Sequence, residues 1–319
     1  MIKTRQTPFS CKAGEFGRFR LCGRPRLRSS KFMRQSLTWI GLCVMAWAGA
    51  AEKAPKVPAG VRLSADLEYA SPGGKSMKLD LYLPENPSSK PLPVVMWVHG
   101  GGWKGGSKSS CPGTWLVTQG YVVASVEHRF IPDYVWPAQI EDCHAAVRWL
   151  RANAAKYGMD GKHIAAWGGS SGGHLVALMG TLDAPSEERV QAVIDWYGPT
   201  DLLTMPPNVL SEKRTRADLA KANGALLLSG IVMDQPEKAK AASALYQVSA
   251  GDAPFLIMHG DQDTSVPVDQ SVRLHEKLKS VGVESSLHII AGAAHGGKLF
   301  EAPEQHKLIE EFLARQLKK

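Results

Sequence analysis

Residues 167–174 read Trp-Gly-Gly-Ser-Ser-Gly-Gly-His, after a short apolar run at 164–167 and at the start of a helical stretch at 172–181. A serine on a tight turn between a strand and a helix needs small residues two positions before and after it. Its own backbone is strained there, and neighbouring chains pass close. The stretch therefore predicts a nucleophilic serine at the carboxyl end of a buried strand, in a protein that alternates strands and helices.

Two frames satisfy this spacing, since Ser170 and Ser171 each have a glycine two positions before and two positions after. We favour Ser170, because it puts the turn directly after the strand and leaves the Ser171 N–H free to act as a backbone donor. Ser171 remains the alternative nucleophile at this point.

Short apolar runs recur along the chain and are typical of strands buried on both faces. They lie at 94–98, 122–126, 164–167, 190–196, 255–258 and 287–290. Two earlier stretches, 61–69 and 77–83, alternate apolar and polar residues as half-exposed antiparallel strands do. Helical stretches follow at 138–157, 172–181, 269–281 and 303–317. The pattern predicts an α/β fold: an eight-stranded, mostly parallel sheet with helices on both faces.

Three consecutive glycines follow the predicted strand at 94–98, in the sequence His-Gly-Gly-Gly-Trp at 99–103. A backbone without side chains can turn several N–H groups toward one point, which is the geometry that holds a developing oxyanion. A simple glycine turn is the structural alternative. His99 and His174 border the two glycine-rich motifs, and we expect both to fix the backbone there.

Two late loops supply candidates for a base and an acid. Residues 259–267 follow the strand at 255–258, and residues 291–297 follow the strand at 287–290. A serine hydroxyl is a weak nucleophile, so it needs a neutral imidazole to take its proton and a buried carboxylate to orient that ring. His295, in the second of these loops, is the predicted base.

The acid has several candidates. Asp263 is favoured because it lies further into its loop than Asp261, closer to a histidine that follows the next strand. Asp261 is expected to tie the turn. Asp195 and Asp201 flank the preceding strand and remain competitors. No pair of histidines has metal-ligand spacing with an acid nearby, so neither a catalytic metal nor any other cofactor is expected.

The net charge of +8 comes from one part of the chain. Residues 1–50 hold ten Lys or Arg and one acidic residue, and the remainder holds 28 basic and 29 acidic residues. A nucleic-acid partner is therefore not expected. The apolar stretch 37–48 follows Arg34 and runs into Ala-Gly-Ala at 48–50, as signal peptides do. Its twelve residues are too few to span a bilayer.

These features predict an upstream extension at 1–32, a signal peptide at 33–50, a linker at 51–60 and one catalytic domain at 61–319. The mature protein is then periplasmic or secreted, with no stable membrane association. A basic tail ahead of a membrane anchor is the alternative. Cys111 and Cys143 are the cysteines that remain after cleavage, and a disulfide between them stays open, because nothing in the sequence fixes their separation.

Four motifs in this order resemble the esterase/lipase group of the α/β-hydrolase fold: HGGGW at 99, GGSSGGHL at 168, HGDQDTSVP at 259 and AAHG at 293. Within it, residues 61–317 are most similar to bifunctional feruloyl and acetyl xylan esterases, with kynurenine formamidases as close cousins. The resemblance implies the catalytic residues Ser170, Asp263 and His295 and the oxyanion donors Gly101, Gly102 and Ser171. Relatives usually carry alanine in place of Ser171.

The resemblance implies an exported serine esterase that acts through an acyl-enzyme on small acyl or aromatic-acyl esters, plausibly acetyl or feruloyl esters of plant polysaccharide. The alternatives are amide, formamide or peptide hydrolysis by the same triad, a general short-chain carboxylesterase, and a binding protein on an inactive scaffold. The expected partner is a small-molecule or polysaccharide ester, and no feature predicts an oligomeric state.

Three further expectations concern the surroundings of the site. Trp103 is expected to form a wall of the cleft, beside the glycine loop. Residues 202–246 are expected to contain helices and to lean over the site without forming a full lid, so no large cap domain is predicted. Trp136 and Trp196 are expected in the core or at the rim, and Arg129 and Asp142 as a structural ion pair.

Overall fold

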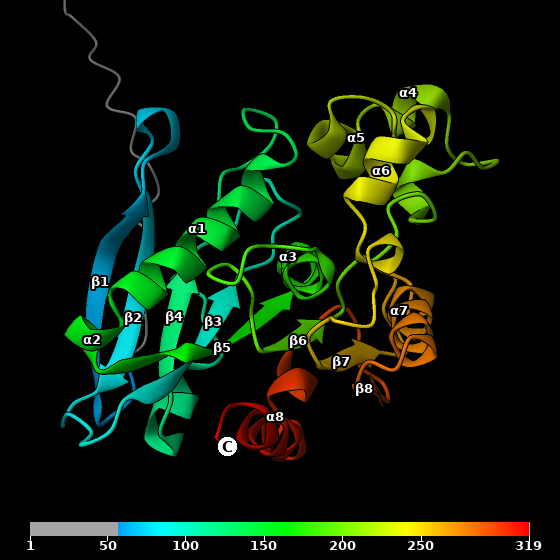
Figure 1. Ribbon diagram of the computed structural model, residues 1–319. Helices are drawn as coiled ribbons and strands as arrows, with labels where there is room; N and C mark the ends of the chain where they lie inside the picture. The colour runs from blue at the N-terminus through cyan, green and yellow to red at the C-terminus, as the bar shows by residue number, and fades with distance from the viewer. Residues whose placement is uncertain (1–56, 319) are drawn as a thin grey trace, which may run out of the picture. The chain divides into compact units, whose positions relative to one another are not determined.

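One eight-stranded sheet organises the computed structural model, which describes residues 57–318 (Figure 1). The strands are β1 (Val61–Ala70), β2 (Met77–Pro84), β3 (Leu92–Val98), β4 (Val122–Val126), β5 (Met159–Gly169), β6 (Ala192–Trp196), β7 (Phe255–Gly260) and β8 (Ser285–Ile290). Their order is β1-β2-β4-β3-β5-β6-β7-β8. The β1–β2 and β2–β4 pairs are antiparallel, and the remaining pairs are parallel. The predicted fold class is confirmed.

Several predicted features lie outside the described residues. These are the upstream extension at 1–32, the signal peptide at 33–50 and the first part of the linker, 51–56. Within the described range, no helix is both long and apolar enough to cross a bilayer.

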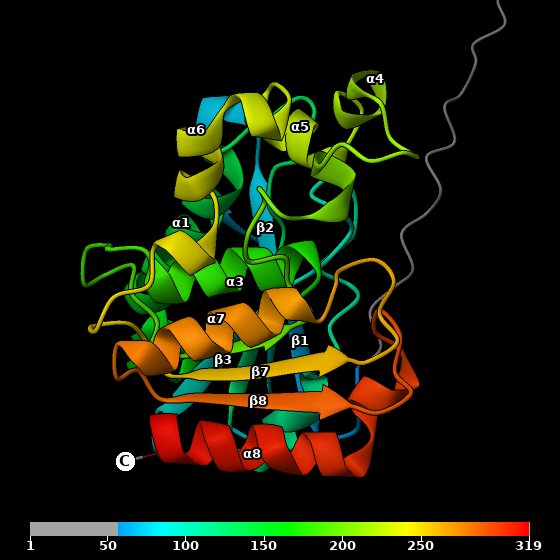
Figure 2. The same cartoon turned by 90° about the vertical axis from the view of Figure 1, so that its right-hand side faces the viewer.

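Helices cover both faces of the sheet (Figure 2). One face carries α1 (Ala138–Ala152), α3 (Ser171–Thr181) and α7 (Asp269–Ser280), and the other carries α8 (Pro303–Leu317). Strand β3 shows why both faces need cover. Met96 and Val98 pack into the core beneath α1 and α3, whereas Val95 and Trp97 pack into the core beneath α8. Alternate residues of this strand are thus apolar on both sides, as expected of a central parallel strand.

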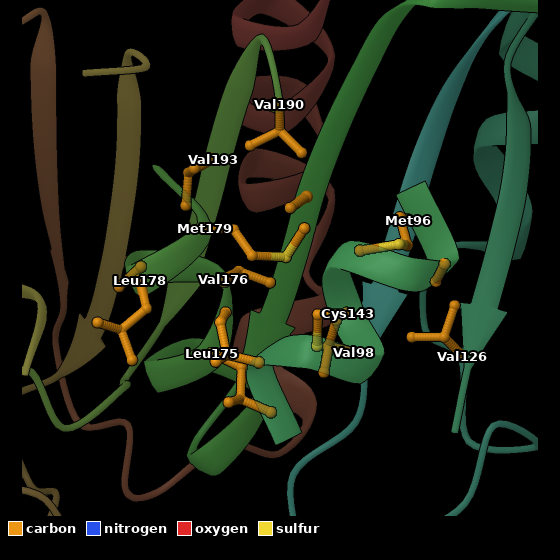
Figure 3. Packing of buried hydrophobic residues seen from close by; sticks show 14 of the residues in the cluster. Met96, Val98, Val126, Cys143, Leu175, Val176, Leu178, Met179, Val190 and Val193 are labelled. Atoms are coloured by element: carbon orange, nitrogen blue, oxygen red, sulfur yellow. The ribbon is translucent and has the colours of Figure 1, made fainter. Parts of the chain in front are cut away.

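The core beneath α1 and α3 is shown in close view in Figure 3. Leu175 and Leu178 of α3 belong to the same buried cluster as Met96 and Val98 of β3 and Val193 of β6. All eleven residues of α3 are buried. Helix α3, which begins directly after the turn at Ser170, is therefore held by packing along its whole length. This packing fixes the position of the turn.

The predicted helix at 138–157 is wrong in one respect, because it breaks at Asn153. Helix α1 ends there, and a short helix α2 (Ala154–Tyr157) follows and stops at Gly158, whose φ is 67°. Both the backbone N–H and the side-chain Nδ2 of Asn153 donate to the carbonyl of Trp149, each at 2.9 Å. A side chain that competes for backbone acceptors in this way is a common reason for a helix to end.

The open disulfide between Cys111 and Cys143 is not formed, and both cysteines are free. Cys143 is buried in the core on the α1 side of the sheet, and Cys111 packs against the core on the α8 side. A sheet with a side-chain layer on each face separates them by more than the few ångströms that a disulfide allows.

Two expectations about structural residues hold. The Nε of Arg129 lies 2.9 Å from Oδ1 of Asp142, and the two side chains are only 12% and 2% exposed. Trp196 is buried, and Trp136 packs partly buried against the core. None of these residues lines the active-site pocket described below.

The segment 202–246 contains helices, as expected (Figure 1). They are α4 (Arg216–Leu219), α5 (Asn223–Leu228) and α6 (Pro236–Ala241), with 3₁₀ turns before α4, between α5 and α6, and after α6. Thr215 and Asp218 form a capping box at the start of α4. We call residues 202–246 the insertion, because they separate β6 from β7 beyond what one crossover helix requires.

Candidate active site

Ser170 occupies a strained turn between β5 and α3. Its φ is 56° and its ψ is −121°, a conformation that an L-residue keeps only when its surroundings enforce it. Its N–H donates to the carbonyl of Trp196 at 2.9 Å. A Cβ on Gly172 would lie 2.1 Å from the carbonyl oxygen of Val98, and one on Gly168 would lie 2.4 Å from that of Gly172. The glycines at these positions are therefore required by the close approach of backbone.

The structure brings the three predicted catalytic side chains together. Nε2 of His295 lies 2.7 Å from Oγ of Ser170, and Nδ1 of His295 lies 2.6 Å from Oδ2 of Asp263. A neutral imidazole fits both contacts: its Nδ1–H donates to the carboxylate, and its Nε2 accepts the serine hydroxyl. The side chain of Asp263 is fully buried, whereas that of His295 is 26% exposed and open to the pocket.

Asp263 is held by more than the catalytic histidine. Its Oδ1 accepts the N–H groups of Ser265 and Val266 at 2.8 and 2.9 Å. Nε2 of His259 lies 3.2 Å from its Oδ2. These donors compensate for the burial of a charged carboxylate and fix its orientation toward His295.

His259 is a neutral support behind the acid. Burial lowers its pKa. Its Nε2–H donates to the carbonyl of Val266 at 2.9 Å, and its Nδ1 accepts the hydroxyl of Ser271 at 2.7 Å. No role was assigned to His259 from the sequence, although its position four residues before Asp263 was the available signal for a place beside the acid.

The other candidate acids stand outside this cluster. Oδ1 of Asp261 accepts the N–H of Gly292 at 2.8 Å, so Asp261 ties the loop after β7 to the loop after β8. Asp195 is buried beneath the turn that follows β6, where its Oδ1 accepts a backbone N–H. Asp201 pairs with Arg273 at 2.8 Å. None of the three reaches His295 by a hydrogen bond in the described residues.

The predicted oxyanion donors flank Ser170 from two directions. Gly101, Gly102 and Trp103 have φ values of 119°, 63° and 60°, so this loop turns successive N–H groups in a way that ordinary strands do not. Ser171 is the first residue of α3, where the N–H has no acceptor within the helix. Gly102 and Ser171 line the pocket with Ser170. Gly101 directly precedes Gly102 in the glycine loop and is not among the lining residues.

The side chain of Ser171 has no role in this cluster. It is 1% exposed, and its Oγ has no hydrogen-bond partner. The imidazole of His295 meets the hydroxyl of Ser170 instead. Of the two frames left open by the sequence, the geometry supports Ser170.

Trp103 forms a wall of the pocket, and His174 holds it there. The indole Nε1–H donates to Nδ1 of His174 at 3.2 Å, with the two rings edge to face. Nε2–H of His174 in turn donates to the carbonyl of Ala242 in the insertion at 2.7 Å. Burial lowers the pKa of His174 to about 4, so the ring is neutral at ordinary pH and Nδ1 is an acceptor.

His99 supports the glycine loop, as the sequence suggested. Its Nδ1 lies 2.8 Å from the carbonyl oxygen of Gly100, and its ring stacks on His128 with centroids 4.7 Å apart. A Cβ on Gly106 would lie 2.3 Å from the His99 ring. The loop is thus wrapped around this imidazole.

A pocket of about 350 Å³ opens above these groups. Half of its lining comes from the insertion, in two stretches at 202–208 and 221–224, so the insertion forms a wall over the serine as expected. A nucleophile, a base and convergent N–H donors in one pocket can carry out nucleophilic attack on an acyl carbon and stabilise the tetrahedral oxyanion.

The chain has relatives among curated proteins. The esterase LipC of Mycobacterium tuberculosis (strain ATCC 25618 / H37Rv) is 32% identical over 240 residues, covering 70% of this chain and 57% of the relative. The esterase LipQ of the same organism is 29% identical over 261 residues, covering 78% and 60%. The chain therefore spans a little over half the length of these relatives.

Solved structures of esterases are similar to this chain as well, and the similarity covers more of their length than it does for the curated relatives. A truncated carbohydrate esterase from gut microbiota has a TM-score of 0.74 and 29% identity, covering 84% of this chain and 100% of that one. An acetyl ester-xyloside bifunctional hydrolase from Caldicellulosiruptor lactoaceticus has a TM-score of 0.65 and 26% identity, covering 81% and 97%. The family model described as BD-FAE matches residues 79–278, well over half of the sequence. The chain belongs to the BD-FAE family.

Proposed function

We propose that this protein is a serine carboxylic ester hydrolase that works through an acyl-enzyme. The observation that carries the proposal is the hydrogen-bonded line from Ser170 through His295 to Asp263, with distances of 2.7 and 2.6 Å. This line ends in a pocket that also contains Gly102 and Ser171 as backbone donors. Such an arrangement activates a hydroxyl and stabilises the oxyanion that its attack creates.

The proposed reaction has two halves. In the first, Oγ of Ser170 attacks the ester carbonyl while Nε2 of His295 takes its proton, and the oxyanion accepts hydrogen bonds from the glycine loop and from Ser171 N–H. The imidazolium then protonates the leaving alcohol, and an acyl-serine remains. In the second half, His295 deprotonates a water molecule that attacks the acyl carbon, and the serine leaves with the proton returned to it.

Asp263 contributes through His295 rather than by moving a proton itself. Its buried carboxylate keeps the hydrogen on Nδ1, so that Nε2 faces the serine as an acceptor, and it stabilises the imidazolium that forms transiently in each half. The two N–H donors from Ser265 and Val266 hold it in that position.

The proposed substrates are small acyl or aromatic-acyl esters, including acetyl or feruloyl esters of plant polysaccharide. The pocket volume of about 350 Å³ suits a small acyl group. Two of the similar solved structures are described as a carbohydrate esterase and an acetyl ester-xyloside hydrolase, which favours a carbohydrate alcohol. We further propose that the protein is exported, on the basis of the leader-like sequence at 33–50.

A substrate panel tests this proposal. It contains p-nitrophenyl acetate, butyrate and decanoate, methyl ferulate, acetylated xylan and N-formylkynurenine, each assayed with the wild type and with Ser170→Ala. We expect hydrolysis of the short p-nitrophenyl esters and of acetylated xylan or methyl ferulate, and none with the variant. Cleavage of formylkynurenine alone would contradict the ester proposal, as would equal rates in the two proteins.

A further inference from the structure

A four-residue stretch of the insertion, residues 221–224, forms one side of the pocket. It joins the end of α4 to the start of α5, and all four residues line the pocket. It lies against the glycine loop that contains Gly101 and Gly102: a Cβ built on Gly102 would come within 2.5 Å of Nδ2 of Asn223. We call these four residues the donor strip. Whatever binds at the glycine loop therefore lies next to it.

The donor strip carries two side-chain donors. They are the ammonium of Lys221 and the amide nitrogen of Asn223, and both residues line the pocket. Across residues 57–318, neither side chain takes part in a hydrogen bond or ion pair within the protein. Asn223 is half-buried and Lys221 is exposed, and since the fold itself uses neither the amide nitrogen nor the ammonium, both are available to a ligand.

The pocket offers no negative charge to balance Lys221. No aspartate or glutamate is among its lining residues. Asp218 lies outside the lining; hydrogen bonds from the N–H and hydroxyl of Thr215 to its Oδ2, and to a lesser extent the charge of Lys221, lower its pKa. Asp263 lies behind His295, with its side chain fully buried.

Two donors in a pocket whose lining holds no carboxylate match one kind of group best. A carboxylate accepts from both at once through its two oxygens, and charged acceptors form stronger hydrogen bonds than neutral ones. The oxyanion of the reaction itself binds to the backbone donors. The donor strip is therefore available to bind a second negative group on the substrate. Neutral acyl and alcohol groups would leave Lys221 without a partner in the pocket.

We propose that the donor strip binds a carboxylate on the ester substrate, through Lys221 and Asn223, and so selects anionic esters over neutral ones. This inference rests on the proposed esterase function and adds a substrate class to it. The class comprises esters whose acyl or alcohol part carries a carboxylate a few bonds from the scissile carbonyl.

Matched pairs of esters test the selection. On the alcohol side, 4-acetoxybenzoate is compared with neutral 4-acetoxybenzamide. On the acyl side, monophenyl adipate is compared with phenyl hexanoate. For each pair the readout is the ratio of kcat/KM for the anionic ester to that for the neutral ester. We expect a ratio above one in at least one pair at low ionic strength, falling in 0.5 M NaCl because salt screens an exposed charge.

Variants assign the selection to the strip. In the favoured pair, Lys221→Gln should lower the ratio about fivefold, the size expected of one partly exposed charge pair. Lys221→Glu should lower it further, by about twentyfold, and Asn223→Ala should lower it severalfold. Lys213→Gln is the matched control, because Lys213 is an exposed lysine of the same insertion that does not line the pocket. It should leave the ratio unchanged.

The outcomes separate this inference from the proposed function. Turnover of the neutral esters with ratios near one in both pairs, or ratios that do not change in Lys221→Gln and Lys221→Glu, would overturn the inference and leave the esterase function standing. A wild-type protein that cleaves no ester and whose Ser170 does not react with a fluorophosphonate would overturn the esterase function itself.

Discussion

The ring of Tyr197 packs against the imidazole of His295, with centroids 4.7 Å apart and planes tilted by 59°. Tyr197 follows directly after β6 and has a φ of 45°, which is unusual for a residue with a side chain. Phe300 also packs against the Tyr197 ring, edge to face, with centroids 4.7 Å apart. The strained backbone is thus held so that an aromatic ring packs against His295, the proposed catalytic base.

Tyr197 is expected to act as a positioning residue through this packing. Tyr197→Leu should lower kcat by about tenfold or more with little change in KM, because small displacements of a catalytic group are costly. Tyr197→Phe keeps the ring and should retain most of the activity. Steady-state kinetics with p-nitrophenyl acetate measure both variants. Equal losses in the two variants would show that the ring is not the relevant feature.

Asp263→Asn should reduce kcat by roughly 10⁴-fold while the protein stays folded, since an amide favours the wrong tautomer of His295. Asp261→Asn is the matched control in the same loop. It weakens only the tie to Gly292 and should cost less than about tenfold. Kinetics and circular dichroism of the two variants check this prediction, which fails if Asp261→Asn is the more damaging change.

Trp103→Phe should lower the free energy of unfolding by about 1–3 kcal/mol. The change removes the indole donor and leaves Nδ1 of His174 buried without a partner. Urea denaturation at pH 7.5 measures the effect. A variant as stable as the wild type would mean that this hydrogen bond does not anchor the pocket wall.

Asp195 gives the fold a defined dependence on pH. It is fully buried with Oδ2 unpartnered, and burial raises its pKa to about 7. Because the folded pKa lies above the unfolded value of 3.8, the folded state holds a proton that the unfolded state releases between about pH 4 and 7. Raising the pH through this window therefore destabilises the wild type.

Asp195→Asn removes this titration. The stability of the variant relative to the wild type should increase by roughly 4 kcal/mol between pH 4 and pH 8, since each pKa unit corresponds to about 1.4 kcal/mol. The lowered pKa of His174, about 4, acts in the opposite direction, because it makes the protein less stable as the pH falls below 6.5. This effect is the same in the wild type and the variant and cancels in the difference. Urea unfolding across this range measures the difference, and a constant difference would refute the assignment.

The convergence of Ser170, Asp263 and His295 could be predicted from the sequence because each follows a strand. Ser170, Asp263 and His295 lie after β5, β7 and β8, and the carboxyl ends of parallel strands meet at one edge of the sheet. The order of the strands did not need to be known for this. The frame ambiguity at Ser171 needed the backbone, since only the geometry shows which hydroxyl meets the imidazole.

Other features depended on packing that a linear pattern does not encode. Tyr197 follows β6, which was a usable signal, but its contact with His295 depends on the positive φ at that residue. Asn223 lies in the insertion, whose short helices lack a long periodic stretch, and nothing in the sequence brings it to Gly102. The cysteines, similarly, could be assigned to opposite faces only once the sheet was known.

The central claim is that Ser170 is the nucleophile, and Ser171→Ala provides a matched control one residue away. Ser171→Ala removes an unpartnered hydroxyl and keeps the N–H. Wild type, Ser170→Ala and Ser171→Ala are incubated with a fluorophosphonate and analysed by intact mass and by turnover of p-nitrophenyl acetate. We predict one adduct and activity in the wild type and in Ser171→Ala, and neither in Ser170→Ala. An adduct with retained turnover in folded Ser170→Ala would contradict the account.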